Sequence, residues 1–318
     1  TEFFTDYSTN VYAVDVKTGK LLWNRRAGYE AQSPTTGSVA VHNGMIYVPI
    51  SSIEVGAVVN SKVDCCFSSG GVVALDAKTG KEIWRYRTTP KAVETGKKRN
   101  GQAAYGPSGA PVWCSPTVDA KRGRLYIGTG QNYSYPATNT SDAIQALDLK
   151  TGKVIWTFQA TPNDMYNVAC PFLINCPDKP GPDVDFGMAP LLVKRSDGTE
   201  ILIAGQKSGV VHALSTEGKV LWQTRVGKGS PLGGIHWGMA TDGKYAYAAN
   251  SDHVYLVNRR DSSFPISPGM YALDLLDGKL AWKTAPPDCG KQYCLTGNSA
   301  APVVIPGVVF AGNLDGHI

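Results

Sequence analysis

Four oxygen-bearing side chains of this sequence could together hold a hard divalent cation. They are Glu54, Gln131, Asn132 and Asp185. Carboxylate and amide oxygens are the ligands that Ca²⁺ takes in proteins. Their spacing is a weak signal by itself, because a single acid such as Glu54 is more often a solvated loop residue. The set becomes a calcium site only if the fold brings distant segments together.

A second set of side chains suits a flat, anionic molecule that is rich in oxygen. Trp113 offers an aromatic face for stacking, Lys207 supplies a positive charge, and hydroxyl groups can donate hydrogen bonds to carboxylates. The further members are Thr36, Ser38, Ser51, Ser52, Trp237 and Asn298. A carboxylate such as Asp185 could also act as a base if it lies within hydrogen-bond reach of a substrate.

One short motif, repeated five times, predicts the elements that position these side chains. Each copy reads as a strand, a turn that contains Gly-Lys and a tryptophan, over residues 11–23, 73–84, 146–156, 212–222 and 271–282. The tryptophans recur roughly every 60 to 70 residues, which suits one four-stranded propeller blade plus a long loop. The sequence therefore predicts an all-β propeller of four-stranded antiparallel blades, with each tryptophan packed between neighbouring blades.

One repeat shows how the site would form. Residues 38–41, 45–50, 71–76 and 81–86 are predicted as strands A to D, from the innermost to the outermost. Because antiparallel strands alternate in direction, the D-to-A and B-to-C connections of every blade lie on one face. The starts of A strands and the ends of B strands should then converge on one axial pocket, which is a common place for ligands. Both sets of side chains come from these positions.

The two ends of the chain supply incomplete blades. Residues 1–27 are predicted to form strands B, C and D of one blade, and residues 299–318 strands A and B of another. Four complete blades lie between them. We therefore expect residues 1–318 to form a single propeller domain that is part of a longer ring. A small closed ring is the alternative.

Composition excludes several other classes of function. The 318 residues are 42% hydrophobic, which is enough for a large core. The net charge is +5, but the lysines are spread over the hairpin turns, so no nucleic-acid surface is expected. No apolar run reaches the ~18 residues of a membrane span.

The seven cysteines indicate an oxidising compartment. Cys170 with Cys176, and Cys289 with Cys294, are spaced as loop-closing disulfides. Cys65 and Cys66 are adjacent, and Cys114 is left over. Zinc binding is the competing interpretation, although the chain lacks a C-x-x-C ladder. It also lacks C-x-x-C-H, so no covalent c-type haem is expected.

At this point the chain resembles a known family, the quinoprotein alcohol dehydrogenases, and within it the polyvinyl-alcohol dehydrogenases. The resemblance covers essentially the whole chain and depends on residues 74–81 (ALDAKTGK), 128–134 (GTGQNYS), 185–187 (DFG) and 233–237 (GGIHW). It implies an eight-bladed propeller that holds pyrroloquinoline quinone (PQQ) and Ca²⁺ on its axis. It also implies the oxidation of secondary or polymeric alcohols by hydride transfer to the quinone, a cytochrome c as electron acceptor, and a periplasmic or secreted location.

The resemblance implies roles for individual residues around the cofactor. Thr36 and Ser51 match the family's hydroxyls that hold quinone carboxylates. Trp113 matches the floor under the quinone, and Lys207 matches the cation beside its oxygens. Glu54 matches the calcium glutamate.

Three positions depart from the family pattern or leave a choice open. Gln131 stands where the family has its calcium asparagine, so either Gln131 or the following Asn132 could bind the metal. Asp185 resembles the catalytic aspartate, with Asp164 as the second candidate, and an ungapped match puts Asn167 at that place.

The family often caps the quinone with a disulfide between adjacent cysteines, but on the preceding blade. Cys65 and Cys66 could swing over the site or only staple their own loop. Two other classes of function also stay open. One is a non-catalytic scaffold, like the outer-membrane assembly lipoprotein of similar fold, and the other is a sensor or carbohydrate-binding propeller without redox chemistry.

Overall fold

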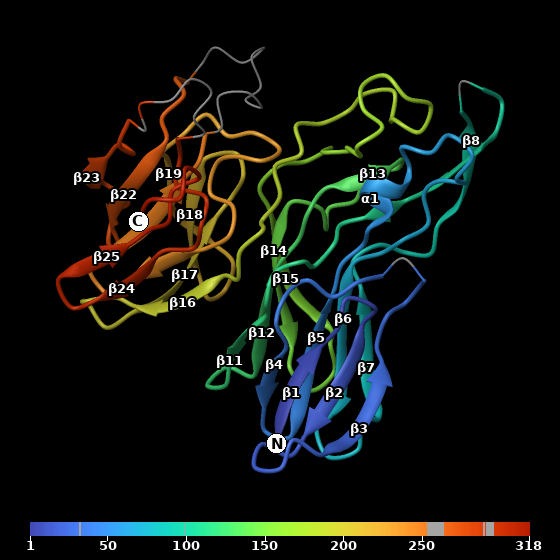
Figure 1. Cartoon of the computed structure of the whole chain (residues 1–318), viewed down its shortest axis with the longest axis horizontal. Coiled ribbons are helices and arrows are strands. Elements are labelled where there is room, and N and C mark those ends of the chain that lie inside the picture. Colours follow the sequence, from blue (N-terminus) through green and yellow to red (C-terminus); the bar gives the residue numbers. More distant parts are fainter. Residues whose placement is uncertain (32, 99, 253–263, 289, 291–295) are drawn as a thin grey trace. The chain divides into compact units, whose positions relative to one another are not determined.

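A computed structural model describes residues 1–31, 33–98, 100–252, 264–288, 290 and 296–318. Within these residues the regular secondary structure is almost entirely β-strand, and the chain divides into two compact units, Thr1–Asp183 and Val184–Ile318 (Figure 1). One helix of four residues, α1 (Glu54–Ala57), lies in the first unit. The prediction of an all-β protein is confirmed.

The first unit contains three antiparallel sheets and two strand pairs. The sheets follow the orders β1-β2-β3, β4-β5-β6-β7 and β11-β12-β14-β15. Strands β8 and β9 pair with each other, as do β10 and β13. The bounds are β1 (Glu2–Thr5), β2 (Asn10–Val14), β3 (Leu21–Arg26), β4 (Ala40–His42), β5 (Met45–Ile50), β6 (Gly71–Asp76), β7 (Glu82–Arg87), β8 (Val93–Lys97), β9 (Ala103–Gly106), β10 (Ser108–Gly109), β11 (Thr117–Asp119), β12 (Arg124–Gly128), β13 (Asn132–Ser134), β14 (Ala143–Asp148) and β15 (Val154–Gln159).

The second unit contains two further four-stranded sheets and a two-stranded one, again with neighbouring strands paired in chain order. The bounds are β16 (Leu191–Lys194), β17 (Glu200–Gly205), β18 (Val210–Ser215), β19 (Val220–Arg225), β20 (Met239–Thr241), β21 (Tyr245–Asn250), β22 (Gly269–Asp274), β23 (Leu280–Thr284), β24 (Val303–Ile305) and β25 (Val308–Phe310). The four complete four-stranded sheets, the three-stranded start and the two-stranded end agree with the sequence-based prediction.

The A strands begin later than predicted. Residues 38–41 were expected as the first of them, whereas β4 covers Ala40–His42. The other predicted starts also lie before their strands, since β11 begins at Thr117, β16 at Leu191 and β20 at Met239. The residues ahead of each of these strands are held by single backbone hydrogen bonds, and not by the regular series of bonds between paired strands.

The repeated Asp-x-x-Thr-Gly motif forms a tight hairpin turn. The Asp76 carboxylate accepts hydrogen bonds from the backbone N and the Oγ1 of Thr79, at 2.8 and 2.7 Å. Gly80 follows with φ +70°, a conformation that glycine adopts without steric cost. Asp15 and Asp148 make the same turn in their own sheets. This turn explains why the motif recurs.

In three of the sheets, the tryptophan of the repeated motif contacts the sheet that follows in sequence. Trp84 Nε1 donates to Leu149 O at 3.1 Å, and Trp23 and Trp222 donate in the same way to Ala77 O and Leu275 O. The apolar cores lie between the same sheet pairs. The core between β4–β7 and the sheet of β11, β12, β14 and β15 includes Tyr47, Val72, Ala74, Trp84, Val112, Leu125, Ile127 and Leu147.

Candidate functional site

One backbone hydrogen bond recurs at the same place in each of the four complete sheets. It joins a residue one or two positions after the second strand to a carbonyl ahead of the first strand. We call these four bonds the rung bonds. They run from Ser51 N to Pro34 O, Gly130 N to Pro111 O, Lys207 N to Asp185 O and Ser251 N to Gly234 O, at 2.9 to 3.0 Å.

A second set of hydrogen bonds ties neighbouring sheets together at the rung bonds. Val112 N donates to Ile50 O in the first unit, at 3.0 Å, and Ile235 N donates to Gln206 O in the second, at 3.2 Å. The segments that the sequence predicted to converge therefore do so within each unit. Their meeting follows from the order of the strands, because A-strand starts and B-strand ends lie at the same end of every sheet.

The predicted cofactor residues occupy equivalent positions relative to the rung bonds. The residue two positions after each acceptor carbonyl is Thr36, Trp113, Gly187 or His236. Ser51 and Lys207 are themselves donors of rung bonds. In the first unit Thr36 Oγ1 donates to Trp113 O at 3.2 Å. Ser38 N donates to Ser115 Oγ at 2.9 Å. A Cβ on the intervening Gly37 would lie 2.6 Å from the Cys114 carbonyl carbon, so only glycine permits this close approach.

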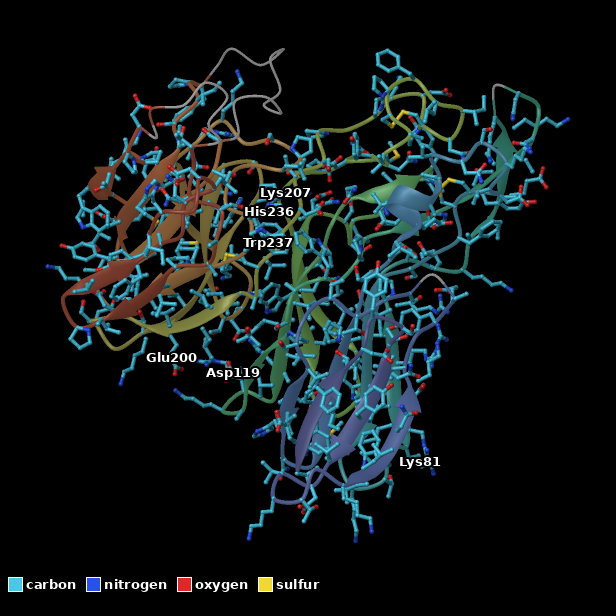
Figure 2. The ribbon with its side chains drawn as sticks, in the orientation of Figure 1. Lys81, Asp119, Glu200, Lys207, His236 and Trp237 are labelled. Atoms are coloured by element: carbon cyan, nitrogen blue, oxygen red, sulfur yellow. A yellow bond between two sulfur atoms is a disulfide. The ribbon has the colours of Figure 1, made fainter. Side chains whose placement is uncertain are left out.

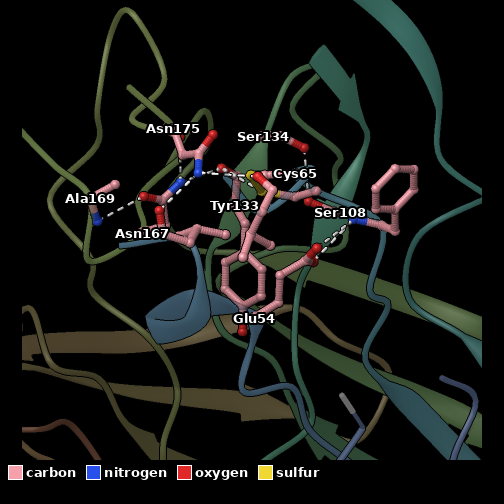
Figure 3. Close-up of a disulfide and its surroundings, with 12 residues drawn as sticks. Glu54, Cys65, Ser108, Tyr133, Ser134, Asn167, Ala169 and Asn175 are labelled. Carbon is pink, nitrogen blue, oxygen red and sulfur yellow. Dashed lines mark hydrogen bonds between the residues drawn. A yellow bond between two sulfur atoms is a disulfide. The ribbon is translucent and has the colours of Figure 1, made fainter. Parts of the chain in front are cut away.

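Glu54 is buried at the start of α1 and is held by the loop that follows (Figure 3). Its carboxylate accepts hydrogen bonds from Phe67 N, Ser68 N and Ser68 Oγ, at 2.5 to 3.1 Å. Ser52 Oγ accepts from Glu54 N and donates to Ser68 Oγ. Burial raises the pKa of Glu54, against the opposing hydrogen bonds from Ser68 and Phe67. Glu54 is therefore not the solvated loop acid that the sequence left possible.

The two amides that follow β12 differ in what surrounds them. The Asn132 side chain is used within its own sheet, because its Oδ1 accepts from Thr138 N and its Nδ2 donates to Ser108 O. Gln131 is also buried, and its Nε2 donates to Tyr166 O at 3.3 Å.

The two alternatives to Asp185, Asp164 and Asn167, are both buried and both form hydrogen bonds with backbone groups. Asp164 is fully buried, and its Oδ1 accepts from Asp183 N at 3.1 Å. Asn167 is also fully buried; its Nδ2 donates to Tyr133 O and Asn175 O (Figure 3). These contacts fix the long connection between β15 and β16.

The described residues contain two disulfides, of which Cys170–Cys176 is one of the two pairs predicted from their spacing. Cys65 and Cys66 are joined to each other and pack with Val58, Tyr133 and Ala169, and Cys170 is joined to Cys176. Cys114 is free and buried, and burial raises the pKa of its thiol to about 11. The predicted pair Cys289 and Cys294 lies outside the described residues.

In the second unit, Asp185 and Lys207 form a buried ion pair. Lys207 Nζ lies 3.2 Å from Asp185 Oδ2, and each side chain is 7% exposed. His236 lies beside the pair, close to Lys207 and Trp237 (Figure 2). Burial, followed by the charge of Lys207, lowers the pKa of His236 to about 4, so its imidazole is neutral at pH 7. The sequence had not singled out His236, although it stands at the same rung position as Thr36 and Trp113.

Two other predicted cofactor residues lie further along the same unit. The indole of Trp237 stacks on His236 with ring centroids 4.5 Å apart and is 55% exposed. Asn298 is buried next to Gly312, whose carbonyl accepts from Asn298 Nδ2 at 3.5 Å. Trp237 therefore offers an open aromatic face, and Asn298 does not.

Two cavities of the first unit lie among these segments. One of about 300 Å³ is lined by Thr35, Thr36, Gly37 and Ser38 together with β1. The other, of about 370 Å³, lies beside Cys65 and Tyr133. In the described part of the chain, no helix is long and apolar enough to cross a membrane. No three His, Cys, Asp or Glu side chains gather there either, so a cation site in these residues would have to draw on amide oxygens.

Comparison with known proteins identifies relatives of this chain. A family model for PQQ, described as the glucose/ethanol/alcohol dehydrogenase beta-propeller domain, matches residues 47–182. Polyvinylalcohol dehydrogenases from Pseudomonas sp and from Sphingopyxis sp. (strain 113P3) are each 38% identical to the chain over 99% of its length. The chain is a homologue of the quinoprotein alcohol dehydrogenases. It spans about half of these relatives, 49% in each case.

The fold of this homologue agrees with solved structures. A quinohemoprotein alcohol dehydrogenase of Pseudomonas putida HK5 superposes with a TM-score of 0.66 over 98% of this chain and 54% of that chain. The two are 17% identical, so this likeness shows the shared β-propeller fold alone. The segment of this chain that matches the family model includes Glu54, Trp113 and Gln131 but ends before Asp185.

Proposed function

We propose that the protein containing this chain is a PQQ-dependent dehydrogenase that oxidises secondary alcohols, including polymeric ones such as polyvinyl alcohol. The observation that carries the proposal is the 38% identity to polyvinylalcohol dehydrogenases over nearly the whole chain. The buried pair of Asp185 and Lys207 adds a carboxylate and a cation at a rung position. Because the chain spans about half of these relatives, the activity is proposed for the whole protein.

The architecture proposed for that protein is an eight-bladed ring. Four complete four-stranded sheets and two partial ones occupy a length that corresponds to about half of the relatives. The rest of a protein of that length is long enough to supply the blades that an eight-bladed ring would still need. Residues 1–318 would then belong to one propeller domain, with the repeat tryptophans joining its blades.

The residues of the first unit fit a planar ligand that carries carboxylates. Thr35 Oγ1 is buried without a hydrogen-bond partner among the described residues, and it lines the same cavity as Thr36 and Ser38. A hydroxyl in this state can donate to a ligand carboxylate. Thr36 and Ser51 would hold such carboxylates, and Trp113 would stack on the ring system. PQQ, when bound, supplies a two-electron oxidant.

For the metal we propose Ca²⁺ bound by Glu54 and Gln131. Glu54 supplies a buried carboxylate whose burial cost a cation would offset, and Gln131 supplies a neutral amide oxygen. Asp185 is assigned to proton transfer instead of metal binding, because the Lys207 ammonium already balances its charge.

In the proposed mechanism the protein orients the alcohol and moves one proton. A carboxylate oxygen of Asp185 accepts the proton of the substrate hydroxyl, a role that requires hydrogen-bond reach. Lys207 Nζ keeps that carboxylate in place and stabilises negative charge that develops beside it. His236 stays neutral and adds no competing positive charge. PQQ, if held beside these residues, would supply the acceptor for the hydride that the alcohol carbon loses.

We further propose that a cytochrome c takes the electrons and that the protein is periplasmic or secreted. The two disulfides within the described residues support an oxidising compartment. The net charge of +5 sets no strong preference for an acidic partner, because the lysines are dispersed. An acceptor assay with several purified cytochromes c would identify the partner.

The test of the proposed function uses the full-length protein. It is loaded with PQQ and Ca²⁺ and given polyvinyl alcohol or propan-2-ol, and the reduction of a dye is followed. We expect turnover that requires both additions, and a loss of about 10²- to 10⁴-fold in kcat for Asp185→Asn. Asp277→Asn, which removes a carboxylate from the exposed pair with Lys279, is the matched control and should keep full activity.

Absence of turnover by the loaded full-length protein with every alcohol would overturn the proposed function. An undiminished rate for Asp185→Asn would leave the function standing and remove Asp185 from its role. In that case Asp164→Asn is the next variant to measure.

A further inference from the structure

A cavity of about 370 Å³ lies among the long connections of the first unit, away from the rung bonds. Its walls come from the β8–β9 hairpin, from the connection that carries Cys65, from residues 133–135 and from residues 174–178. These are connections of the D-to-A and B-to-C kinds, which the strand order puts on one face. The volume is within the ~300–1,000 Å³ of small-molecule sites.

Hydrogen bonds and disulfides hold these walls in place. Tyr105 N donates to Cys65 O, and Cys66 N donates to Tyr105 O, at 3.1 and 3.2 Å. Asn175 Nδ2 donates to Val58 O at 2.8 Å, and Lys179 N donates to Tyr135 Oη at 3.1 Å. Each wall is thus tied to another wall or to a disulfide loop. The cavity is therefore formed before any ligand enters, which lowers the entropic cost of binding.

The lining combines apolar surface with hydrogen-bonding groups. The apolar part consists of tyrosine rings and small aliphatic side chains, namely Tyr105, Tyr133, Tyr135, Ala104, Ile174 and Pro177. The polar part includes Lys98 and Asn175. Asn175 Oδ1 is buried and has no hydrogen-bond partner among the described residues, so it calls for a donor. Lys98 offers donors: its Nζ donates to Val63 O at 3.5 Å and carries further N–H groups.

We propose that this cavity binds a short stretch of a polyhydroxylated carbon chain, at a distance from the carbon that is oxidised. This inference rests on the proposed function, since it names how a polymeric substrate would be recognised. A hydroxyl group both donates and accepts, so it can satisfy Asn175 Oδ1 and Lys98 Nζ alike. The methylene groups between hydroxyls would pack on the tyrosine rings.

The rim of the cavity supports an elongated ligand. The disulfide loop that supplies residues 174–178 also carries Phe172, which is 89% exposed, and Leu173, which is 43% exposed. A chain that leaves the cavity along this loop would cover part of this apolar surface. The charges of the lining are mixed, since Lys97 and Lys98 stand opposite Asp178, so a neutral chain is favoured over a polyanion.

The first test measures polymer binding without the cofactor. The full-length protein is titrated with polyvinyl alcohol, and binding is followed by equilibrium dialysis. We expect about tenfold weaker binding for Tyr135→Ala and about threefold for Lys98→Met. The controls Tyr7→Ala and Lys150→Met alter exposed turns of the same unit and should bind like the wild type. Lys98→Met also serves as the second variant if Tyr135→Ala does not fold.

Two results of this titration would overturn the inference. One is wild-type affinity in both cavity variants. The other is preferential binding of polyacrylate or inorganic phosphate over polyvinyl alcohol, which would make the cavity an anion site.

The second test separates this inference from the proposed function. With the loaded enzyme, Tyr135→Ala should raise KM for polyvinyl alcohol about tenfold and leave kcat and the KM for propan-2-ol unchanged. An equal rise of KM for both alcohols would place Tyr135 at the reacting centre and overturn the inference. Polymer binding that depends on Tyr135, in a protein that oxidises no alcohol, would support the inference while the proposed function fails.

Discussion

Lys207 and Asp185 are joined twice, through the main chain and through their side chains. Lys207 N donates to Asp185 O at 3.0 Å, and Lys207 Nζ lies 3.2 Å from Asp185 Oδ2. The backbone bond is the rung bond of this sheet. The two residues are thus held together by their main chains as well as by their side chains. If either side chain moved away, the charge of the other would lose this contact while it stayed buried.

Removing one partner of this pair should destabilise the protein more than removing both. Lys207→Met leaves the Asp185 carboxylate buried without its ammonium, and the cost of such a change is roughly 3–5 kcal/mol. Adding Asp185→Asn to it should recover part of this loss. Urea unfolding of both single variants and the double variant gives the coupling energy. The exposed pair Asp277 and Lys279 is the control, and its double variant should leave stability unchanged. Equal losses in the single and double variants would contradict a buried ion pair.

Stability should depend on pH through His212. Burial, with a smaller contribution from Arg225, lowers the pKa of His212 from 6.5 to about 4. The folded state therefore excludes a proton that the unfolded chain binds, so stability rises between about pH 4 and 6.5 and is lost as the pH falls. The full effect is roughly 3 kcal/mol. Unfolding free energies measured across this range should have a shallower slope in His212→Asn than in the wild type, and an unchanged slope would contradict the prediction.

Contact between a tryptophan and a turn glycine can be separated from backbone strain. Gly152 has φ +68°, and a Cβ there would lie 2.5 Å from Trp84 Cε3. Gly123 has φ +65° with nothing within 4 Å of its Cβ position. Gly123→Ala should thus cost about 1 kcal/mol from conformation alone, and Gly152→Ala about 1–3 kcal/mol more from overpacking. Denaturant midpoints and Trp fluorescence of both variants measure this difference, and equal losses would mean that Trp84 moves aside freely.

Calcium should stabilise the full-length protein through Glu54. A ligand that binds only the native state adds about 2.7 kcal/mol at a hundred times its dissociation constant. Thermal melting with and without Ca²⁺ should therefore shift the wild-type Tm and leave that of Glu54→Gln unchanged. Glu82→Gln changes a glutamate in the exposed pair with Arg85 and is the matched control. A calcium shift that persists in Glu54→Gln would mean that the cation binds elsewhere.

The sequence predicted strands well where hydrophobic alternation is strong. β5 and β6 match the predicted residues 45–50 and 71–76 at both ends. β7 is displaced by one residue, to Glu82–Arg87, because the pairing shifts register between Ala74 and Leu75. The short α1 was not predicted, since four residues carry no helical period.

The site was predicted to the extent that strand order determines it. The meeting of Thr36 with Trp113, and of Asp185 with Lys207, follows from topology and could be derived from the repeats. The surroundings of Glu54 and the orientation of the Asn132 amide could not, because both depend on how irregular loops close. His236 escaped notice because its position matters only once the rung bonds are known.

Main-chain atoms alone make the rung bonds, and this has an evolutionary consequence. Thr36, Trp113, Gly187 and His236 occupy one repeated position with a hydroxyl, an indole, a hydrogen and an imidazole. Replacing any of these side chains changes the groups offered to a ligand, because the rung bonds themselves involve no side chain. Substitutions at these four positions can therefore change the exposed chemistry while the main-chain bond of each sheet is kept.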